Sequence, residues 1–204
     1  MSAQHFRVLD CTNYQEINQD LLDYVHRYTT IAVKSKDYAY CNFLDKFGHT
    51  NVHFVRSNPK LISWFDTMEM SLRDIYFTLA WTSEHSKTTE SSCPIHIDKP
   101  PVCWKLNWPI MNMEKTSVRF YHQKDPQVDI NTLIERSGDP DSKDIDHRGL
   151  DYKDFVEVER HDFNKNQPII MNGQVAHDVG FYENPKFPRI GMQVMFFKEP
   201  AHLL

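Results

Sequence analysis

Hydrophobic and polar residues repeat along the chain with two different periods. In two early segments, residues 16–28 and 60–70, apolar residues recur every three or four positions, which is typical of amphipathic helices. Asn58-Pro59 precedes the second segment and is typical of a helix start. From Leu72 onward the period shortens toward two, which favours β-strands. The pattern predicts strands near residues 73–81, 93–98, 102–108, 116–122, 153–160, 167–171, 174–182 and 190–198.

These elements predict an α+β fold with a β-rich core. Short strands separated by turn signals are typical of a sandwich or barrel, and the helices before them would pack outside a sheet as supports. At 204 residues the chain is long enough for one domain with a full hydrophobic core. We therefore predict a single domain, 1–204, in which a helical support region (1–72) precedes a β core (73–198).

The segment 123–151 interrupts the strand pattern. It contains Gly138-Asp139-Pro140-Asp141 and only a short helical stretch near 130–135. Because a long structureless loop in a compact domain is usually functional or disordered, two interpretations are open. One is a lid or substrate-recognition loop over the mouth of the β core, and the other is a mobile surface insertion.

Composition and charge exclude several classes of protein. The net charge of −5 argues against general nucleic-acid binding, which usually needs a basic surface. The apolar runs are far shorter than the roughly 20 residues of a membrane span, and the chain does not open with a signal-like segment. Four cysteines without Cys-x-x-Cys spacing argue against a zinc ribbon and favour reduced thiols. We therefore expect a cytoplasmic protein without membrane segments.

Two short segments carry candidate metal ligands. His96 and Asp98 lie two residues apart in a predicted strand, so their side chains share one face. His177 follows the dipeptide Asn172-Gly173, which is a strong signal for a hairpin turn. Two histidines and one carboxylate form the set that holds non-haem Fe(II) and leaves other positions open. Each signal alone is weak, since with 11 His and 28 acidic residues His-x-Asp arises by chance, and His177 also fits a half-buried structural histidine.

A third feature is an arginine at the start of the last predicted strand. Arg189, Gly191 and Gln193 share one face of that strand because side chains alternate with period two. A guanidinium is a planar fork that matches a carboxylate through two hydrogen bonds. The alternative is a surface arginine at a strand end, which is common.

The order His-x-Asp, distal His and Arg resembles the Fe(II)/2-oxoglutarate-dependent oxygenase superfamily. The stretches Ile95–Asp98, Leu106–Ile110 and Phe120-Tyr121 resemble small bacterial and phage members related to prolyl hydroxylases. The resemblance covers about residues 75–198. It implies that the β core is a double-stranded β-helix, or jelly roll, which fits the number of predicted strands.

The resemblance also implies roles for individual residues. Arg189 would bind the distal carboxylate of 2-oxoglutarate. Many members carry a hydroxyl residue two positions after the arginine, but this chain has Gly191 there, so a second anchor must come from elsewhere. The residues that would bind Fe(II) and form the catalytic centre are His96, Asp98 and His177. The candidates for the second cosubstrate anchor are Gln193, Asn107 and Tyr121.

The favoured function is therefore a dioxygenase that uses Fe(II), 2-oxoglutarate and O₂ and releases succinate and CO₂. Its substrate would be a peptide side chain or a small amino-acid-like metabolite, which it would hydroxylate. Two alternatives stay open. One is a cupin-type metal enzyme that does not use 2-oxoglutarate, against which Arg189 argues. The other is a catalytically silent jelly-roll binding module, against which the intact His-Asp-His set argues.

Overall fold

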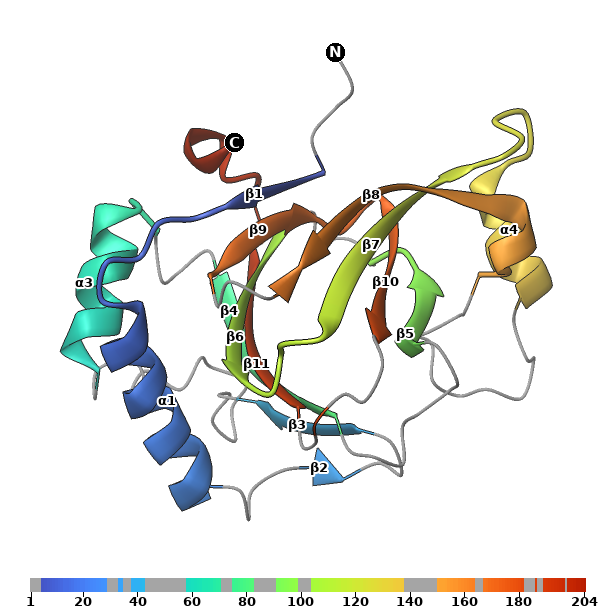
Figure 1. Ribbon diagram of the computed structural model, residues 1–204. Helices are drawn as coiled ribbons and strands as arrows, with labels where there is room; N and C mark the ends of the chain where they lie inside the picture. Colours follow the sequence, from blue (N-terminus) through green and yellow to red (C-terminus); the bar gives the residue numbers. More distant parts are fainter. Residues whose placement is uncertain are drawn as a thin grey trace.

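A computed structural model describes most of the chain, and within its described residues the protein is β-rich, with two antiparallel sheets and few helices (Figure 1). None of the helices in these residues combines the length and hydropathy needed to span a membrane. The described residues are 5–28, 33–34, 38–42, 58–70, 75–82, 91–98, 104–137, 150–163, 167–181, 186, 189–196 and 198–204.

The larger sheet joins strands that are far apart in the sequence. Among the described residues its order is β1-β9-β6-β11-β4-β3-β2, and every neighbouring pair is antiparallel. Its strands are β1 (Phe6–Val8), β2 (Val33–Lys34), β3 (Tyr38–Asn42), β4 (Ile75–Thr82), β6 (Trp104–Met111), β9 (Ile169–Asn172) and β11 (Arg189–Phe196).

The smaller sheet has the order β5-β10-β7-β8. Its strands β5 and β10 carry the two candidate metal-binding histidines, His96 and His177. The bounds are β5 (Ser91–His96), β7 (Thr116–Gln123), β8 (Phe155–Asp162) and β10 (Ala176–Phe181).

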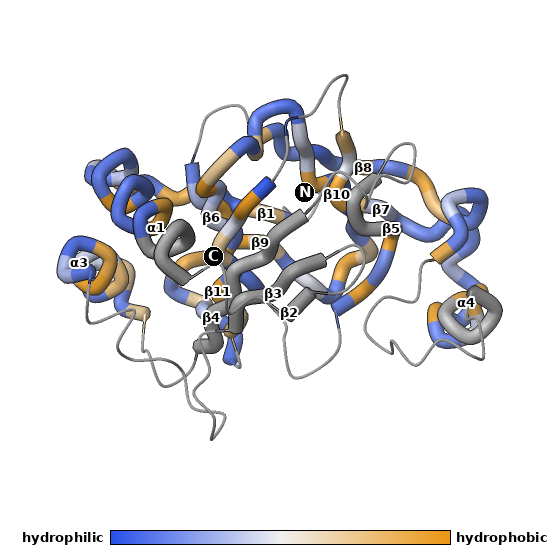
Figure 2. Tube along the Cα trace, turned by 90° about the horizontal axis from the view of Figure 1, so that it is seen from below, coloured by the Kyte–Doolittle hydropathy of each residue, from blue (hydrophilic) through white to orange (hydrophobic). Residues whose placement is uncertain are grey.

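Helices α1 (Tyr14–Tyr28) and α3 (Pro59–Thr67) cover the outer face of the larger sheet, as the sequence predicted. Their apolar sides pack on the alternate residues of β6 and β11 that point outward, and Trp108 of β6 is fully buried there. The Asn58 side chain caps α3 by accepting from the Leu61 amide at 2.8 Å. Figure 2 shows hydrophilic and hydrophobic sides on α3, as expected for a surface helix.

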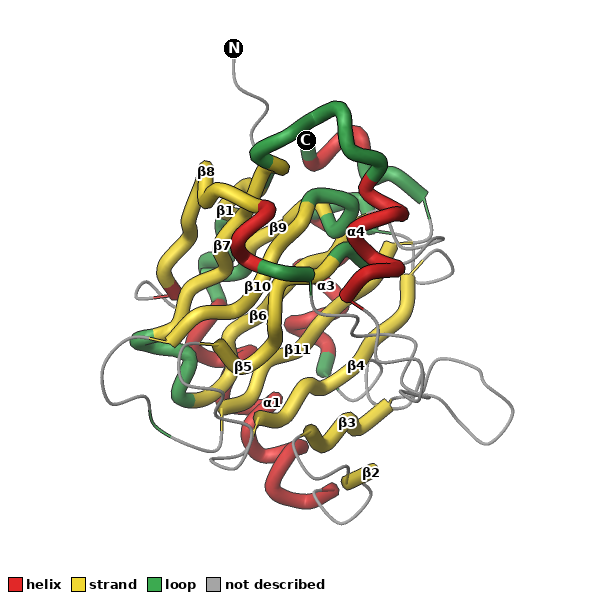
Figure 3. The backbone as a smooth tube through the Cα atoms, turned by 90° about the vertical axis from the view of Figure 1, so that its right-hand side faces the viewer, coloured by secondary structure: helices red, strands yellow, loops and turns green. Residues whose placement is uncertain are grey.

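Helix α4 (Ile130–Ser137) lies at the opposite end of the molecule, in front of the strands in Figure 3. Leu133 packs with Leu150 against the outer face of the smaller sheet, where Ile95 and Ala176 are buried. The predicted short helix near 130–135 is therefore present and slightly longer. Residues 138–149 of the predicted lid lie outside the described residues, so the lid remains a prediction, as does the division into support and core regions.

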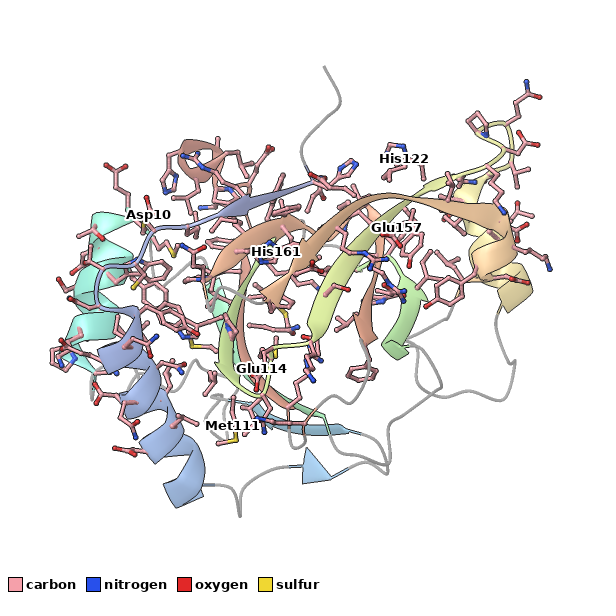
Figure 4. The ribbon with its side chains drawn as sticks, in the orientation of Figure 1. Asp10, Met111, Glu114, His122, Glu157 and His161 are labelled. Atoms are coloured by element: carbon pink, nitrogen blue, oxygen red, sulfur yellow. The ribbon has the colours of Figure 1, made fainter. Side chains whose placement is uncertain are left out.

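Side chains from the two sheets face one another in the space between them, with His161 among them (Figure 4). One part of this space is an apolar core that includes Phe120 of β7 and Met171 of β9, both fully buried. Strand β1 covers this part, and its Phe6 stacks on Phe120 with ring centroids 5.8 Å apart. The polar residues considered below occupy another part of the same space.

All eight predicted strands have counterparts, but two expectations about them need correction. The Asn172-Gly173 turn does not close a hairpin, because β9 belongs to the larger sheet and β10 to the smaller one. The predicted strand 93–98 ends at His96, so Asp98 lies just beyond it. Strands β1, β2 and β3 were not predicted; they have only two to five residues each, too few for a clear alternation.

Candidate metal centre

The pairing of β5 with β10 brings the two candidate histidines together. His96 and His177 are directly opposite one another in this antiparallel pair, so their side chains share one face of the smaller sheet. Their ring centroids are 4.3 Å apart. Both residues are buried. Two residues some eighty positions apart in sequence thus become cross-strand neighbours on a rigid element.

Asp98 is held beside them by the turn between β9 and β10. The Asp98 amide donates to the Gly173 carbonyl at 2.9 Å, and the Gln174 side chain donates to the Asp98 carbonyl at 2.9 Å. Gly173 also passes very close to the aspartate, since a Cβ at this position would lie 2.2 Å from Asp98 Oδ2. The turn that connects the two sheets therefore fixes the backbone of Asp98 and leaves room for its carboxylate.

The three side chains offer a compact set of ligand atoms. Asp98 Oδ1 is 3.8 Å from His96 Nε2, and Asp98 Oδ2 is 3.8 Å from His177 Nε2. One ligand atom from each residue lies within 4.8 Å of the others, which is close enough to hold a metal ion. Within the described residues no other group of three His, Cys, Asp or Glu side chains meets this condition.

The hydrogen bonding of His177 fits a metal ligand. Its Nδ1 lies 2.8 Å from the Val175 carbonyl, and because a carbonyl can only accept, Nδ1 carries the proton. The lone pair is then on Nε2, which is buried and has no hydrogen-bond partner among the described residues. A second hydrogen bond that fixes the tautomer and ring orientation is usual for metal-binding histidines. The donor set and this bare nitrogen fit a divalent transition metal.

Electrostatics keep these groups in the forms that bind metal. Burial opposes ionisation of Asp98, but the Lys105 ammonium and the two histidines outweigh it and lower the pKa of Asp98 to about 2. Burial lowers the pKa of His177 well below its usual value, with His96 and Lys105 adding to the effect against the opposing charge of Asp98. At neutral pH Asp98 is therefore ionised and His177 is neutral, as ligation requires.

The depressed pKa of His177 predicts a pH-dependent stability of the metal-free protein. Below pH 6.5 the unfolded chain takes up a proton on this histidine that the folded chain does not, so the free energy of unfolding falls as pH falls. One such proton changes it by up to about 1.4 kcal/mol per pH unit. Urea unfolding with chelator at pH 7.5, 6.5 and 5.5 measures this slope.

The matched control for this slope is His177→Gln, which should lose the contribution of one proton. His5, whose pKa burial also lowers, contributes equally to both proteins. Equal slopes in the two proteins would mean that His177 is protonated in the folded state, contrary to this assignment.

Tyr121 is not brought to the metal centre. It pairs with Ala176, whereas His177 pairs with Phe120, so Tyr121 projects from the opposite face of the smaller sheet. There it lies in the apolar cluster beneath α4, and its ring is 5.9 Å from that of Tyr152. Burial raises the pKa of its hydroxyl. Adjacent residues of a strand face opposite sides, so only one of Phe120 and Tyr121 can face the triad.

The same outer face anchors the strand that carries His177. Asp178 is fully buried and accepts from Arg119 Nε at 2.8 Å and from the Tyr152 hydroxyl at 2.6 Å. Gly180 leaves room for this arginine, because a Cβ there would lie 2.7 Å from Arg119 Cζ. This ion pair ties β10 to β7 directly behind the metal centre and stabilises the position of His177.

Asn107 and Gln193 lie on the face of the larger sheet that looks toward the smaller one. They are opposite one another in the pairing of β6 with β11, and the Asn107 amide donates to Met171 Sδ, which belongs to the core between the sheets. Arg189, which is buried, lies four residues before Gln193 and shares its face by alternation. The alternation along the last strand had predicted that Arg189 and Gln193 share a face, whereas the position of Asn107 opposite Gln193 follows from the register of the sheet.

Lys105 is a residue of this region that sequence reasoning missed. It is buried, and its Nζ lies 3.0 Å from Asp98 Oδ1 and 2.8 Å from Asp98 Oδ2. The contact to Oδ1 has hydrogen-bond geometry, and the closer contact to Oδ2 is a charge contact. A signal was present in the sequence: Lys105 and Asn107 alternate with large apolar residues, so both are polar residues on one face of a buried strand.

The remaining described histidines lie outside the triad. His122 of β7 is exposed and its Nε2 is 3.1 Å from that of His5, while His161 packs against Phe6 and Phe163. Figure 4 shows His122 on β7 and His161 between the sheets. His147 lies outside the described residues. No role is assigned to these histidines from the sequence, and the contacts of the described ones indicate none in metal binding.

Comparisons with known proteins rest on structure alone. No protein-family model matches the chain, and no curated protein matches it significantly. The non-heme α-ketoglutarate-dependent carbocyclase SnoK from nogalamycin biosynthesis is 12% identical, with a TM-score of 0.53 over 95% of this chain and 79% of that chain. The α-ketoglutarate-dependent epimerase SnoN from the same biosynthesis is 10% identical, with a TM-score of 0.48 over 92% of this chain and 74% of that chain. A Pseudomonas putida prolyl-4-hydroxylase is 7% identical, with a TM-score of 0.45 over 96% of this chain and 94% of that chain.

The similarity to SnoK shows a shared fold, and at 12% identity it shows the fold alone. SnoK is named as a non-heme α-ketoglutarate-dependent enzyme, so the resemblance seen in the sequence is confirmed at the level of fold. A second structure of SnoN is a complex with Fe³⁺, nogalamycin RO and α-ketoglutarate, which is another name for 2-oxoglutarate. The candidate metal centre is inferred from the residues of this chain and not from the comparisons.

Proposed function

We propose that this protein is an Fe(II)- and 2-oxoglutarate-dependent dioxygenase with a jelly-roll core that hydroxylates a peptide side chain or a small amino-acid-like metabolite. The observation that carries the proposal is the convergence of His96, Asp98 and His177, whose ligand atoms lie within 4.8 Å of one another. The buried Nε2 of His177 supports it further, because that atom has no hydrogen-bond partner among the described residues.

Each residue has a distinct task in this proposal. His96, Asp98 and His177 would hold Fe(II) on one side and leave the remaining positions for small molecules. Iron at this site would supply the activation of O₂ coupled to decarboxylation of 2-oxoglutarate to succinate and CO₂. The Val175 carbonyl keeps the His177 ring in the tautomer that ligates through Nε2. Gly173 and Gln174 hold the Asp98 backbone in place.

The larger sheet would provide the cosubstrate site. Arg189 starts β11, whereas Met195, six residues later, is opposite Lys105 at the level of the triad. Asn107 and Gln193 lie between these two ends, so a dicarboxylate held between the metal and the long Arg189 side chain would lie beside both amides. Arg189 would bind its distal carboxylate, and the two amides would line its path. Tyr121 has no part in this proposal, since it projects from the outer face of the smaller sheet.

Anaerobic titration tests the proposal. The chelator-treated protein is loaded with Fe²⁺ under argon, and 2-oxoglutarate is added while the visible spectrum is recorded. A metal-to-ligand charge-transfer band that saturates with 2-oxoglutarate is expected, because the keto acid binds the iron directly. Asp98→Asn, which keeps the shape of the side chain and removes its charge, should show no band.

The same titration separates the alternatives. Binding of Fe²⁺ without a band on adding 2-oxoglutarate would favour a cupin-type metal enzyme that does not use this cosubstrate. Failure to bind divalent metal at all would favour a silent jelly-roll binding module. The proposal also includes a cytoplasmic location and a single domain in which 123–151 serves as a lid.

A further inference from the structure

Lys105 places a positive charge directly at the candidate metal centre. It is buried, it lies on β6, and its ammonium contacts both carboxylate oxygens of Asp98. A buried lysine is rare unless it is paired, and here its partner is the carboxylate that the proposed metal needs. When a metal binds Asp98, the positive charge of Lys105 therefore needs another partner.

Resting on the proposed function, we propose that Lys105 recognises a carboxylate of the substrate, so that the substrates of this protein are small carboxylic acids. The lysine is then a specificity-determining residue beside the metal. It is distinct from Arg189, which lies at the other end of the same face.

A count of charges supports this role. Fe(II) brings two positive charges, which Asp98 and the first carboxylate of 2-oxoglutarate balance. Arg189 balances the distal carboxylate. His96 and His177 are neutral when they ligate. Lys105 is then left with one positive charge in a buried site, and a buried charge is costly unless a partner compensates it. An anionic group on the substrate supplies that partner.

The surroundings of Lys105 favour an anion from outside the described chain. An ammonium has three donors, so it can keep one Asp98 oxygen and still donate to a neighbouring ligand. On the smaller sheet, His177 is opposite Phe120, and Phe120 is opposite Glu159 on the next strand. Glu159 thus lies on the far side of Phe120 from His177, and its carboxylate accepts from the His5 amide. It is therefore engaged elsewhere.

Asn107 is the next polar side chain after Lys105 on this face of β6. It follows Lys105 by two positions on the same face, and its amide donates to the sulfur of Met171, which is only a weak acceptor. A carboxylate oxygen would be a better acceptor for this amide. In the proposed function that carboxylate belongs to 2-oxoglutarate, so Lys105 is the donor that is left for a carboxylate of the substrate.

Binding measurements on redox-inert protein test the inference. The protein is loaded with Zn²⁺ and saturated with 2-oxoglutarate, and a panel of small carboxylic acids, including free amino acids, is compared with the matching primary amides by ligand-observed NMR. Wild type should bind members of the panel as acids and discriminate against their amides. Lys105→Met, which keeps the length and removes the charge, should weaken acid binding by roughly tenfold or more.

Two further variants serve as controls. Lys105→Arg keeps the charge and should retain the preference for acids over amides, which separates loss of charge from loss of fold. Lys153→Met changes an exposed lysine of the outer surface and should leave binding unchanged.

Each contrary outcome overturns a definite statement. The inference would be overturned if wild type bound acids and amides equally or bound no acid. It would also be overturned if Lys105→Met bound the acids as tightly as wild type. Weakened 2-oxoglutarate binding by Lys105→Met, with no acid bound by wild type, would assign the lysine to the cosubstrate and also overturn it. Failure of wild type to bind Zn²⁺ or 2-oxoglutarate would instead contradict the proposed function, and these affinities are measured in the same samples.

Discussion

Replacing Gly173 with alanine is expected to weaken divalent-metal binding by roughly 10- to 100-fold. The added Cβ would lie 2.2 Å from Asp98 Oδ2 and 3.0 Å from Asp98 Cγ, so the carboxylate must move. The backbone cannot yield easily, because the Gly173 carbonyl accepts the Asp98 amide. Displacement of one of three ligands removes both a bond and the negative charge that neutralises the metal. Titration of Zn²⁺ or Mn²⁺ into the chelator-treated protein measures the loss.

The matched control for this variant is Gly191→Ala. A Cβ at Gly191 would meet its nearest atom, the Trp108 carbonyl oxygen, at 3.4 Å, and the Met113 side chain beyond that. Both contacts are close to ordinary van der Waals distances, so metal affinity should stay within about twofold of wild type. Thermal unfolding of both variants verifies that they are folded. A folded Gly173→Ala protein with wild-type metal affinity would contradict the placement of Asp98 in the site.

Replacing Arg189 with alanine is expected to weaken 2-oxoglutarate binding by at least tenfold and to leave metal affinity intact. The guanidinium is buried, and removing one partner of a buried ion pair costs about 3–5 kcal/mol, which corresponds to roughly a hundredfold or more in affinity. An exposed pair would contribute only about 0–1 kcal/mol. Titration of 2-oxoglutarate into the Zn²⁺-loaded variant, with metal content determined in parallel, separates the two effects.

Arg189→Lys is the informative companion to this variant. A lysine keeps the charge but replaces the planar fork by a point charge, so it should recover only part of the affinity. Unchanged 2-oxoglutarate binding in Arg189→Ala would remove Arg189 from the cosubstrate site. Loss of metal in Arg189→Ala would indicate a structural role instead.

The sequence predicted the candidate ligands because their local patterns survive folding. His-x-Asp places two ligands within one short segment, and alternation along the strands orients them. The pattern also separated the two faces of β11, since Arg189 and Gln193 alternate with Ile190 and Met192, which are buried beneath the helices. The alternation of polar and apolar residues does not show which strands pair with one another. The Asn172-Gly173 turn was therefore wrongly predicted to close a hairpin, although β9 and β10 belong to different sheets.

The sequence could not predict the roles of residues that contact Asp98 from distant segments of the chain. Gly173 matters because it approaches Asp98, and Lys105 because it contacts the same carboxylate; both contacts join segments from different strands. A lysine in a strand usually indicates a solvated position, so Lys105 received no role. Tyr121 was assigned to the cosubstrate, but the register that pairs Phe120 with His177 turns it to the other face.

Formation of succinate from 2-oxoglutarate tests the proposed activity most directly. Wild type and Asp98→Asn are loaded anaerobically with equal Fe²⁺, exposed to O₂ with 2-oxoglutarate and the carboxylic acids that bind the Zn²⁺ form, and assayed for succinate over time. We expect O₂-dependent succinate release by wild type, faster with a bound acid than without it, and none above the free-iron background by Asp98→Asn. No succinate from an iron-loaded wild type, or equal release by both proteins, would contradict a 2-oxoglutarate-dependent oxygenase built on His96, Asp98 and His177.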